Sequence, residues 1–208
     1  MQIGYLGHSC FQFTAKNGVK IICDPYTKVG YELPKGLYAD ILTLSHAHFD
    51  HNYAKGVEYK VVVNEPKSYC IDGISIDGIE CDHDPQKGVL RGKNIIYKIT
   101  VDGFTVCHMG DIGEECSAEL VTKIGKVDVL LIPVGGTYTI DALGAKKYID
   151  AIAPKTVIPM HYKPKDGALD IAGIEPFLEL VKGEQITRVS HRLIEIDENT
   201  NGIIYMER

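Results

Sequence analysis

Residues 46–51 carry three histidines and an aspartate, and they follow directly on an apolar run with the sequence ADILTLS. An apolar run that ends in polar residues is typical of a buried β-strand followed by a loop. His46 and His48 are two positions apart, so an extended backbone points both imidazoles to the same side, and Asp50 and His51 follow on the turn. Imidazole nitrogen and carboxylate oxygen are suitable ligands for zinc and similar divalent ions. The cluster therefore predicts a metal site at a strand end; the alternative is a set of exposed loop histidines without a function.

Size and composition indicate an ordinary globular domain. The chain has 208 residues, 45% of them hydrophobic and 24% charged, which favours one domain over residues 1–208. A net charge of −6 without a basic patch argues against nucleic acid or an anionic membrane as a partner, so we expect a small-molecule substrate. We expect neither a signal peptide in MQIGYLGHSC nor a membrane-spanning run. The six cysteines form no CxxC pair, which favours free thiols in the cytoplasm. The sequence is compatible with assembly into a homo-oligomer.

The first half of the sequence reads as short strands joined by tight turns. Asn17-Gly18, Asp77-Gly78 and Asp102-Gly103 are each flanked by alternating apolar residues, which is a strong hairpin signal. These hairpins bring three polar residues to strand ends: Asp24, His83 and His108.

The second half alternates helices and strands. Ser117 and Gly125 predict the start and end of one helix, and Asp141 predicts the start of another. The runs VDVLLIPVGG and TVIPMH flank this second helix, so we expect a parallel strand–helix–strand crossover. A last helix over about 171–182 and a hairpin around 199–202 complete the expected elements. Together they favour sheets packed face to face with helices outside, and polar residues at the strand ends.

The motifs resemble those of a known family. SHAHFDH after an apolar strand resembles the His-x-His-x-Asp-His signature of the metallo-β-lactamase superfamily. GHSCF, IICDPY, HMGD, LIPVGGTYT and VIPMHY follow in the order seen in its ascorbate-6-phosphate-lactonase-like branch. The resemblance covers almost the whole chain. It implies an α/β fold, a four-layer αββα sandwich, with a dinuclear metal site between the sheets.

Carried over residue by residue, the resemblance implies two ions. One would be held by His46, His48 and a third histidine, and the other by Asp50, His51 and His161, with Asp111 bridging both. His83 fits the order of motifs best as the third histidine, and His108, three residues before Asp111, is its rival. Zinc is the expected metal, with Mn²⁺ or Fe²⁺ as alternatives.

Other residues are expected around the ligands. The resemblance makes Asp24 a buried aspartate that orients the histidine loop, the alternative being an Asp-Pro turn. His8 would line the cleft or be structural, and His108 would support the ligands if His83 binds the metal. The expected substrate contacts, whose alternative is loop packing, are Thr137, Tyr138 and, for an anionic group, Lys163.

The predicted activity is metal-dependent hydrolysis of an ester, lactone or phosphoester. Two ions sharing a water lower its pKa and give a hydroxide nucleophile, which Asp50 and Asp111 would position as catalytic residues. Two alternatives stay open at this point. One is a mononuclear iron dioxygenase acting on a thiol or persulfide, and the other is a non-catalytic metal-binding protein.

Overall fold

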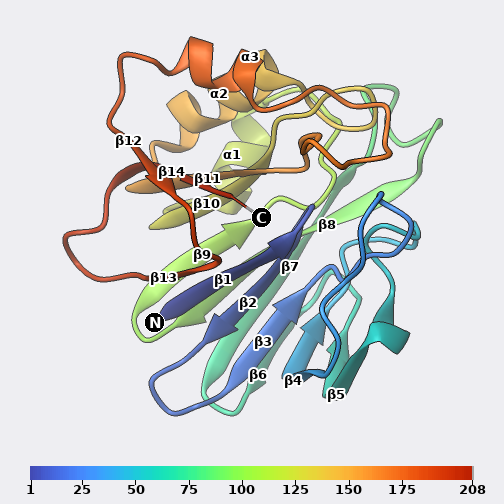
Figure 1. The fold of residues 1–208 in the computed structure, drawn as a ribbon, viewed down its shortest axis with the longest axis vertical. Coiled ribbons are helices and arrows are strands. Elements are labelled where there is room, and N and C mark those ends of the chain that lie inside the picture. Colours follow the sequence, from blue (N-terminus) through green and yellow to red (C-terminus); the bar gives the residue numbers. More distant parts are fainter. Residues whose placement is uncertain (208) are drawn as a thin grey trace.

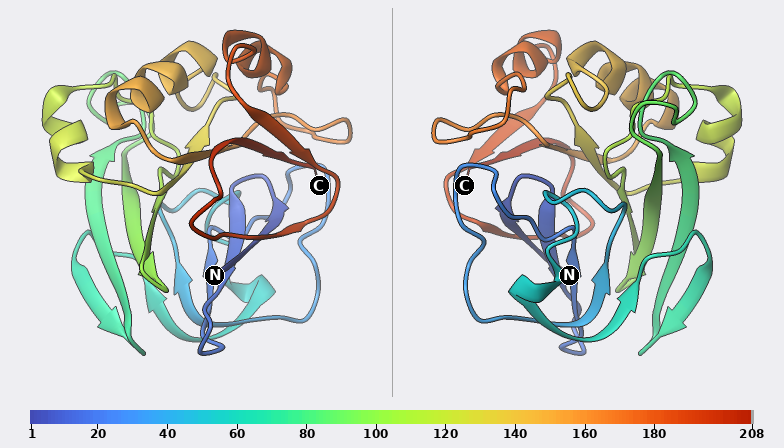
Figure 2. Two further views of the ribbon diagram at one scale, coloured as in Figure 1. Left: turned by 90° about the vertical axis from the view of Figure 1, so that its left-hand side faces the viewer. Right: turned by 90° about the vertical axis from the view of Figure 1, so that its right-hand side faces the viewer.

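The computed structural model describes residues 1–207 and consists of two stacked β-sheets with helices on the outer side of one of them (Figures 1 and 2). Within these residues the first sheet has six strands in the order β13 (Leu193–Glu195), β1 (Gln2–Gly7), β2 (Cys10–Thr14), β3 (Lys20–Cys23), β4 (Leu37–Thr43) and β5 (Val57–Val63). The second has eight in the order β12 (Ile186–Val189), β14 (Gly202–Met206), β11 (Thr156–Met160), β10 (Val129–Pro133), β9 (Phe104–His108), β8 (Lys93–Val101), β7 (Ile74–Asp82) and β6 (Ser68–Ile71).

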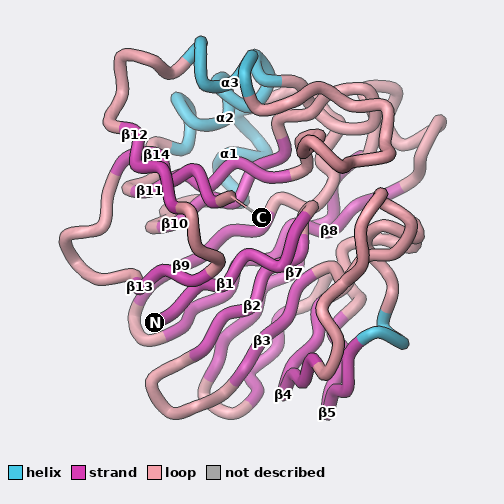
Figure 3. The backbone as a smooth tube through the Cα atoms, in the orientation of Figure 1, coloured by secondary structure: helices cyan, strands magenta, loops and turns pink. Residues whose placement is uncertain are grey.

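The helices of the second half cover the second sheet (Figure 3). They are α1 (Ala118–Ile124), α2 (Ala142–Ile152) and α3 (Glu175–Leu180). The Ser117 hydroxyl accepts a hydrogen bond from the backbone of Leu120, and the Asp141 carboxylate does the same at α2, so both predicted N-caps are confirmed. β10 and β11 are parallel neighbours joined through α2, which confirms the predicted crossover. The last helix is shorter than predicted.

Alternating side chains give the first sheet two buried faces. Ile21 and Ile41 belong to the core between the sheets, whereas Ile22 and Leu42 belong to a second apolar cluster on the outer face. Residues 25–36 cover this cluster together with the 3-10 helix η1 (Ala54–Gly56). The four-layer sandwich is therefore confirmed, and a loop with one 3-10 turn forms one of its outer layers.

Two predicted hairpins are wrong. β7 runs straight through Asp77-Gly78, and the turn lies earlier, at Asp72-Gly73. Gly78 serves a close approach instead, because a Cβ there would lie 2.9 Å from the carbonyl oxygen of Glu65. The expected C-terminal hairpin also fails, since β13 pairs with β1 in the first sheet while β14 pairs with β11 and β12 in the second.

Six strands end at the same edge of the two sheets. β1 and β3 run in the same direction because both are antiparallel to β2, and β4 is parallel to β3. In the second sheet β7 and β9 are both antiparallel to β8, and β11 has the direction of β9 because both are parallel to β10. Each of the segments that follow these strands has a polar residue within its first three positions. The topology thereby brings residues from all parts of the chain to one place: His8, Asp24, residues 46–51, His83, Asp111 and His161.

Candidate metal centre

The histidine loop after β4 is held from below by Asp24. This carboxylate is fully buried and accepts hydrogen bonds from the Ser45 backbone N–H at 2.8 Å, the Ser45 hydroxyl at 2.5 Å and His51 Nδ1 at 2.8 Å. Burial by itself would raise the pKa of Asp24, but the hydrogen bond and charge of His51 bring it below its usual value. With Nδ1 bound to Asp24, the Nε2 atom of His51 faces the interior of the site.

The first ligand group consists of His46, His48 and His83, each of which offers a ring nitrogen within 4.8 Å of those of the others. His48 Nδ1 and His83 Nε2 are 3.1 Å apart. The Nδ1 atom of His46 is 2.9 Å from the Ser45 hydroxyl, so its Nε2 is the atom left for the group. His83 comes from the second sheet and the other two from the first, so the group spans the sheets.

The second ligand group consists of His8, Asp50, His51 and His161, whose ligand atoms also lie within 4.8 Å of one another. His8 Nε2 is 3.3 Å from Asp50 Oδ2, and the His8 and His161 rings are 4.2 Å apart. The backbone at His8 and His161 is left-handed, with φ of 55° and 51°, and the His161 N–H donates to the His8 carbonyl. Such a backbone is uncommon for residues other than glycine, although histidine adopts it more often than most.

Asp111 lies between the two groups. Its Oδ1 is 2.9 Å from His51 Nε2, and its Oδ2 is 3.2 Å from His161 Nε2. Oδ2 is also 3.6 Å from His83 Nε2, so one carboxylate faces both groups. Burial would raise the pKa of Asp111, but His161 and His51 hold it well below its usual range, and the group is a carboxylate at neutral pH.

The loop that carries Asp111 depends on a glycine and an asparagine. The fully buried Asn94 accepts a hydrogen bond from the Asp111 N–H at 2.9 Å and donates to the carbonyl of Met109. Gly110 has a φ of 55°, and a Cβ there would collide with the Asn94 side chain. This explains the glycine of the Gly-Asp pair in physical terms.

The residues of both groups fit a metal ion. Among residues 1–207, three buried ring nitrogens at the site have no hydrogen-bond partner: His46 Nε2, His83 Nδ1 and His161 Nδ1. Leaving this many buried polar atoms unpaired is costly, and coordination to a cation would compensate for it. Burial lowers the pKa of His46 to about 3, so this imidazole is neutral at pH 7, as a metal ligand must be. Burial also lowers the pKa of His8, the neighbour of Asp50, to about 4.

His108 lies outside both groups. Its Nδ1 accepts a hydrogen bond from the Gly110 N–H at 3.1 Å, and its Nε2 donates to the Ser9 carbonyl at 2.8 Å. Both ring nitrogens are therefore used by the backbone, and it is His83 that joins His46 and His48.

A cavity of about 300 Å³ opens beside the ligand groups. Its lining consists of His48, Phe49, Asp50, His83, Arg91, Asp111, Tyr138 and Leu169. Of the three predicted substrate contacts, Tyr138 lines the cavity, whereas Thr137 is exposed beside it. Lys163 is exposed and does not line it, and the lining cation is Arg91.

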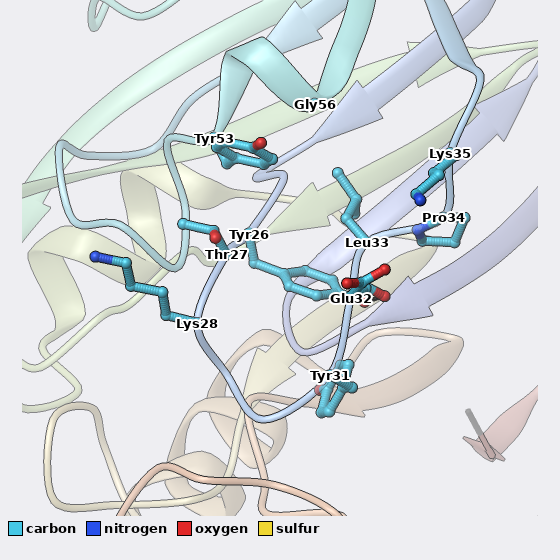
Figure 4. Close-up of a pocket in the computed structure, with 10 residues that line it drawn as sticks. All are labelled: Tyr26, Thr27, Lys28, Tyr31, Glu32, Leu33, Pro34, Lys35, Tyr53 and Gly56. Carbon is cyan, nitrogen blue, oxygen red and sulfur yellow. Dashed lines mark hydrogen bonds between the residues drawn. The ribbon is translucent and has the colours of Figure 1, made fainter.

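A second cavity of about 290 Å³ lies under the loop on the outer face of the first sheet (Figure 4). Tyr26, Tyr31, Leu33 and Tyr53 contribute to its walls. None of its lining residues belongs to either ligand group, so it is not part of the metal centre.

Sequence reasoning missed six residues of the site: Ser45, Phe49, Asp84, Arg91, Asn94 and Leu169. Ser45 and Asp84 are direct neighbours of predicted ligands, and this adjacency was the available signal. Asn94 opens an apolar strand, and Arg91 stands in a polar loop. Neither has a local pattern that distinguishes it.

Two stacked sheets with ligand groups at their common edge define the class of metallo-β-lactamase-like sandwiches. A family model described as a beta-lactamase superfamily domain matches residues 2–161, and the chain belongs to this superfamily. The resemblance to the superfamily is thereby confirmed, and the narrower one to the lactonase-like branch stays a prediction.

Similar proteins agree with this assignment. A UPF0173 metal-dependent hydrolase of Nanoarchaeum equitans is 30% identical over 188 residues, with 78% of this chain and 84% of the relative covered. One of Methanoculleus marisnigri is 31% identical, with 78% and 81% covered. The crystal structure of a candidate zinc-dependent hydrolase of the metallo-β-lactamase superfamily from Thermotoga maritima has a TM-score of 0.81 at 34% identity, with 99% and 97% covered. The chain is accordingly an enzyme of the hydrolase class.

Within residues 1–207, none of the helices has the length and apolar character that crossing a bilayer requires.

Proposed function

We propose that the enzyme is a dinuclear metal hydrolase acting on a small ester, lactone or phosphoester. In this proposal His46, His48 and His83 hold one divalent ion, and Asp50, His51 and His161 hold another. The observation that carries the proposal is the position of Asp111, whose carboxylate oxygens approach histidines of both ligand groups at 2.9 to 3.6 Å. A closed structural zinc site needs four ligands, and the donors here exceed that number.

When bound, a pair of divalent ions supplies a water of lowered pKa as the nucleophile and polarises the oxygen of the bond to be cleaved. Asp50 Oδ2 is the proton acceptor that we assign to this water. Its neighbour His8, at 3.3 Å, orients the carboxylate by hydrogen bonding. The water oxygen bonds to the carbonyl or phosphoryl centre, the bond to the leaving oxygen breaks, and the proton held at Asp50 passes to that oxygen.

The remaining residues of the site have supporting roles in this proposal. Asp24 fixes the tautomer of His51 by accepting from Nδ1, which leaves Nε2 as the ligand atom. Phe49, Tyr138 and Leu169 form the apolar part of the cavity wall and exclude water from the reacting groups. Zinc suits this mixture of imidazole and carboxylate, and Mn²⁺ and Fe²⁺ use the same ligands.

Metal content per chain tests the proposal first. The protein is purified without chelators or a histidine tag and measured by elemental analysis, together with Asp111→Asn and, as a matched control, His191→Gln, an exposed histidine outside both ligand groups. We expect about two equivalents in the wild type and in His191→Gln, and fewer in Asp111→Asn. Hydrolysis of ester, lactone and phosphoester panels should depend on the added metal.

Other results would reject the proposal. A single iron with oxygen uptake on a thiol would identify the alternative dioxygenase. Two ions without turnover of any of the three bond types would support a binding protein. Absence of metal after soaking would contradict the site itself.

A further inference from the structure

Arg91 is the one lysine or arginine among the residues lining the cavity beside the ligand groups. It lies on the loop between β7 and β8, which begins with His83. The cavity therefore has a cation on one wall and the predicted metal ligands Asp50 and Asp111 on another. A guanidinium at such a place calls for an explanation, because it does not belong to either ligand group.

The backbone of Arg91 is fixed by one buried carboxylate. Asp84 is fully buried and accepts hydrogen bonds from the backbone N–H groups of Gln86 at 2.8 Å, Gly88 at 3.2 Å, Leu90 at 2.9 Å and Arg91 at 2.8 Å. Four backbone N–H groups thus converge on one buried carboxylate, and the loop wound around it presents Arg91 in a defined position.

The guanidinium is oriented but only partly used. Its Nη2 donates to the carbonyl of Thr137 at 3.1 Å, and its central carbon lies 5.6 Å from the centre of the Tyr138 ring. Among residues 1–207, no carboxylate forms an ion pair with it. A guanidinium has five N–H donors in a planar fork that matches carboxylate and phosphate oxygens. Most of these donors are available to a ligand in the cavity.

The other walls of the cavity are apolar. Phe49, Tyr138 and Leu169 line it, and Phe49 and Tyr138 are 47% and 37% exposed. Exposed aromatic side chains at the mouth of a cavity bury apolar surface when a ligand binds. The cavity therefore combines an apolar wall, one available cation and the metal-binding end.

We propose that Arg91 is a specificity-determining residue that selects substrates with a carboxylate or phosphate group on an apolar body. The oxyanion binds the guanidinium, the apolar body lies against Phe49, Tyr138 and Leu169, and the bond to be cleaved faces Asp50 and Asp111. This inference rests on the proposed hydrolase function, and it narrows the substrate class of the same site.

The preference for anionic substrates is tested with two esters whose acyl chains have the same length. Mono-4-nitrophenyl glutarate carries a carboxylate, and 4-nitrophenyl pentanoate does not; the readout is the ratio of their kcat/KM values in the metal-loaded enzyme. Arg91→Gln should lower this ratio roughly 10- to 100-fold, since a charged hydrogen-bonding pair is lost. Arg91→Lys should recover part of it. The control is Lys87→Gln, which changes an exposed lysine of the same loop that does not line the cavity, and it should leave the ratio unchanged.

The apolar wall is tested with the same esters. Phe49→Ala should lower kcat/KM for both by a similar factor and preserve their ratio, because it removes apolar contact from each. No loss with either ester would overturn this part of the proposal.

Binding without turnover separates this inference from the hydrolase proposal. Calorimetry compares glutarate, which has a second carboxylate, with pentanoate, which has only the one that metals can bind. The glutarate preference should fall roughly tenfold or more in Arg91→Gln, and 4-phosphonobutanoate shows whether a phosphonate is preferred over a carboxylate. Absence of turnover with this binding preference intact would reject the hydrolase and keep the anion site. An equal loss for both ligands, or no preference in the wild type, would show that Arg91 only holds the Thr137 loop and would overturn the inference.

Discussion

The replacement Asp24→Asn gives the sharpest test of how the metal ligands are oriented. Asparagine has the shape of aspartate and tolerates the left-handed backbone at this position, where φ is 48°. Its carbonyl oxygen can still accept from the Ser45 N–H. Its amide nitrogen, however, would replace the oxygen Oδ2 that accepts from both the Ser45 hydroxyl and His51 Nδ1.

The replacement should change the tautomer of His51. Next to an amide N–H, Nδ1 has to accept a hydrogen bond, and the ring proton then moves to Nε2, the atom that faces Asp111 at 2.9 Å. A protonated Nε2 cannot bind a metal. Replacing a group that orients a ligand weakens metal affinity about 10- to 100-fold, which corresponds to about 1.4 to 2.7 kcal/mol. Loss of a hydrogen bond to a buried charge adds about 1.5 to 3 kcal/mol of destabilisation.

Competitive titration with a chromogenic chelator measures the affinity, and urea denaturation of the metal-free protein measures the stability. The matched control is Asp40→Asn, a carboxylate in β4 that accepts from the Lys20 N–H and pairs with Lys60. It should lower stability without changing metal affinity. Equal metal affinity in wild type and Asp24→Asn would refute the reasoning, because the tautomer of His51 would then not depend on Asp24.

Three further predictions concern protons, ligands and packing. In metal-free protein the lowered pKa of His46, about 3 against 6.5 in an unfolded chain, makes the unfolded state take up the proton first. The unfolding free energy should therefore decrease as pH falls from 6.5 towards 3, by up to about 1.4 kcal/mol per pH unit for this group, and a flat urea profile between pH 6.5 and 4.5 would contradict it. His83→Ala should lower bound metal by about one equivalent while His108→Ala retains both, and elemental analysis of the two variants would expose a reversed pattern. Tyr97→Phe should cost about 1 to 2 kcal/mol in urea denaturation, because the buried hydroxyl donates to two backbone carbonyls at 2.9 and 3.1 Å; unchanged stability would mean that these bonds contribute little.

Local signals in the sequence predicted the elements that depend on local chemistry. The caps at Ser117 and Asp141 were predictable because each side chain bonds to its own helix. Asp77-Gly78 was misread as a turn because its glycine makes room for the backbone at 65–66, which is close in space but lies on another strand connection along the chain. The predicted hairpin of β13 with β14 was wrong for the same reason, since β13 pairs with β1 and β14 pairs with β12, and neither partner is its neighbour in the sequence.

The candidate site likewise has residues that a local sequence pattern predicts and residues that only tertiary packing brings together. The histidine loop is a dense local pattern, and the order of motifs was enough to favour His83 over His108. What distinguishes the two histidines physically is the Ser9 carbonyl that binds His108, and this contact exists only after the sheets have packed. Arg91 was missed and Lys163 named in its place because proximity in sequence to a ligand does not determine which side chain lines a cavity.

The meeting of six strand ends at one edge has a consequence for how the enzyme is made. His8 follows the first strand of the chain and His161 follows β11, yet both belong to the second ligand group. During synthesis this group stays incomplete until β11 has been added and the second sheet has closed over the first. If two ions bind as proposed, the chain acquires the capacity to bind the second only late in synthesis, and tight binding of that ion reports that the last third of the chain has folded onto the first.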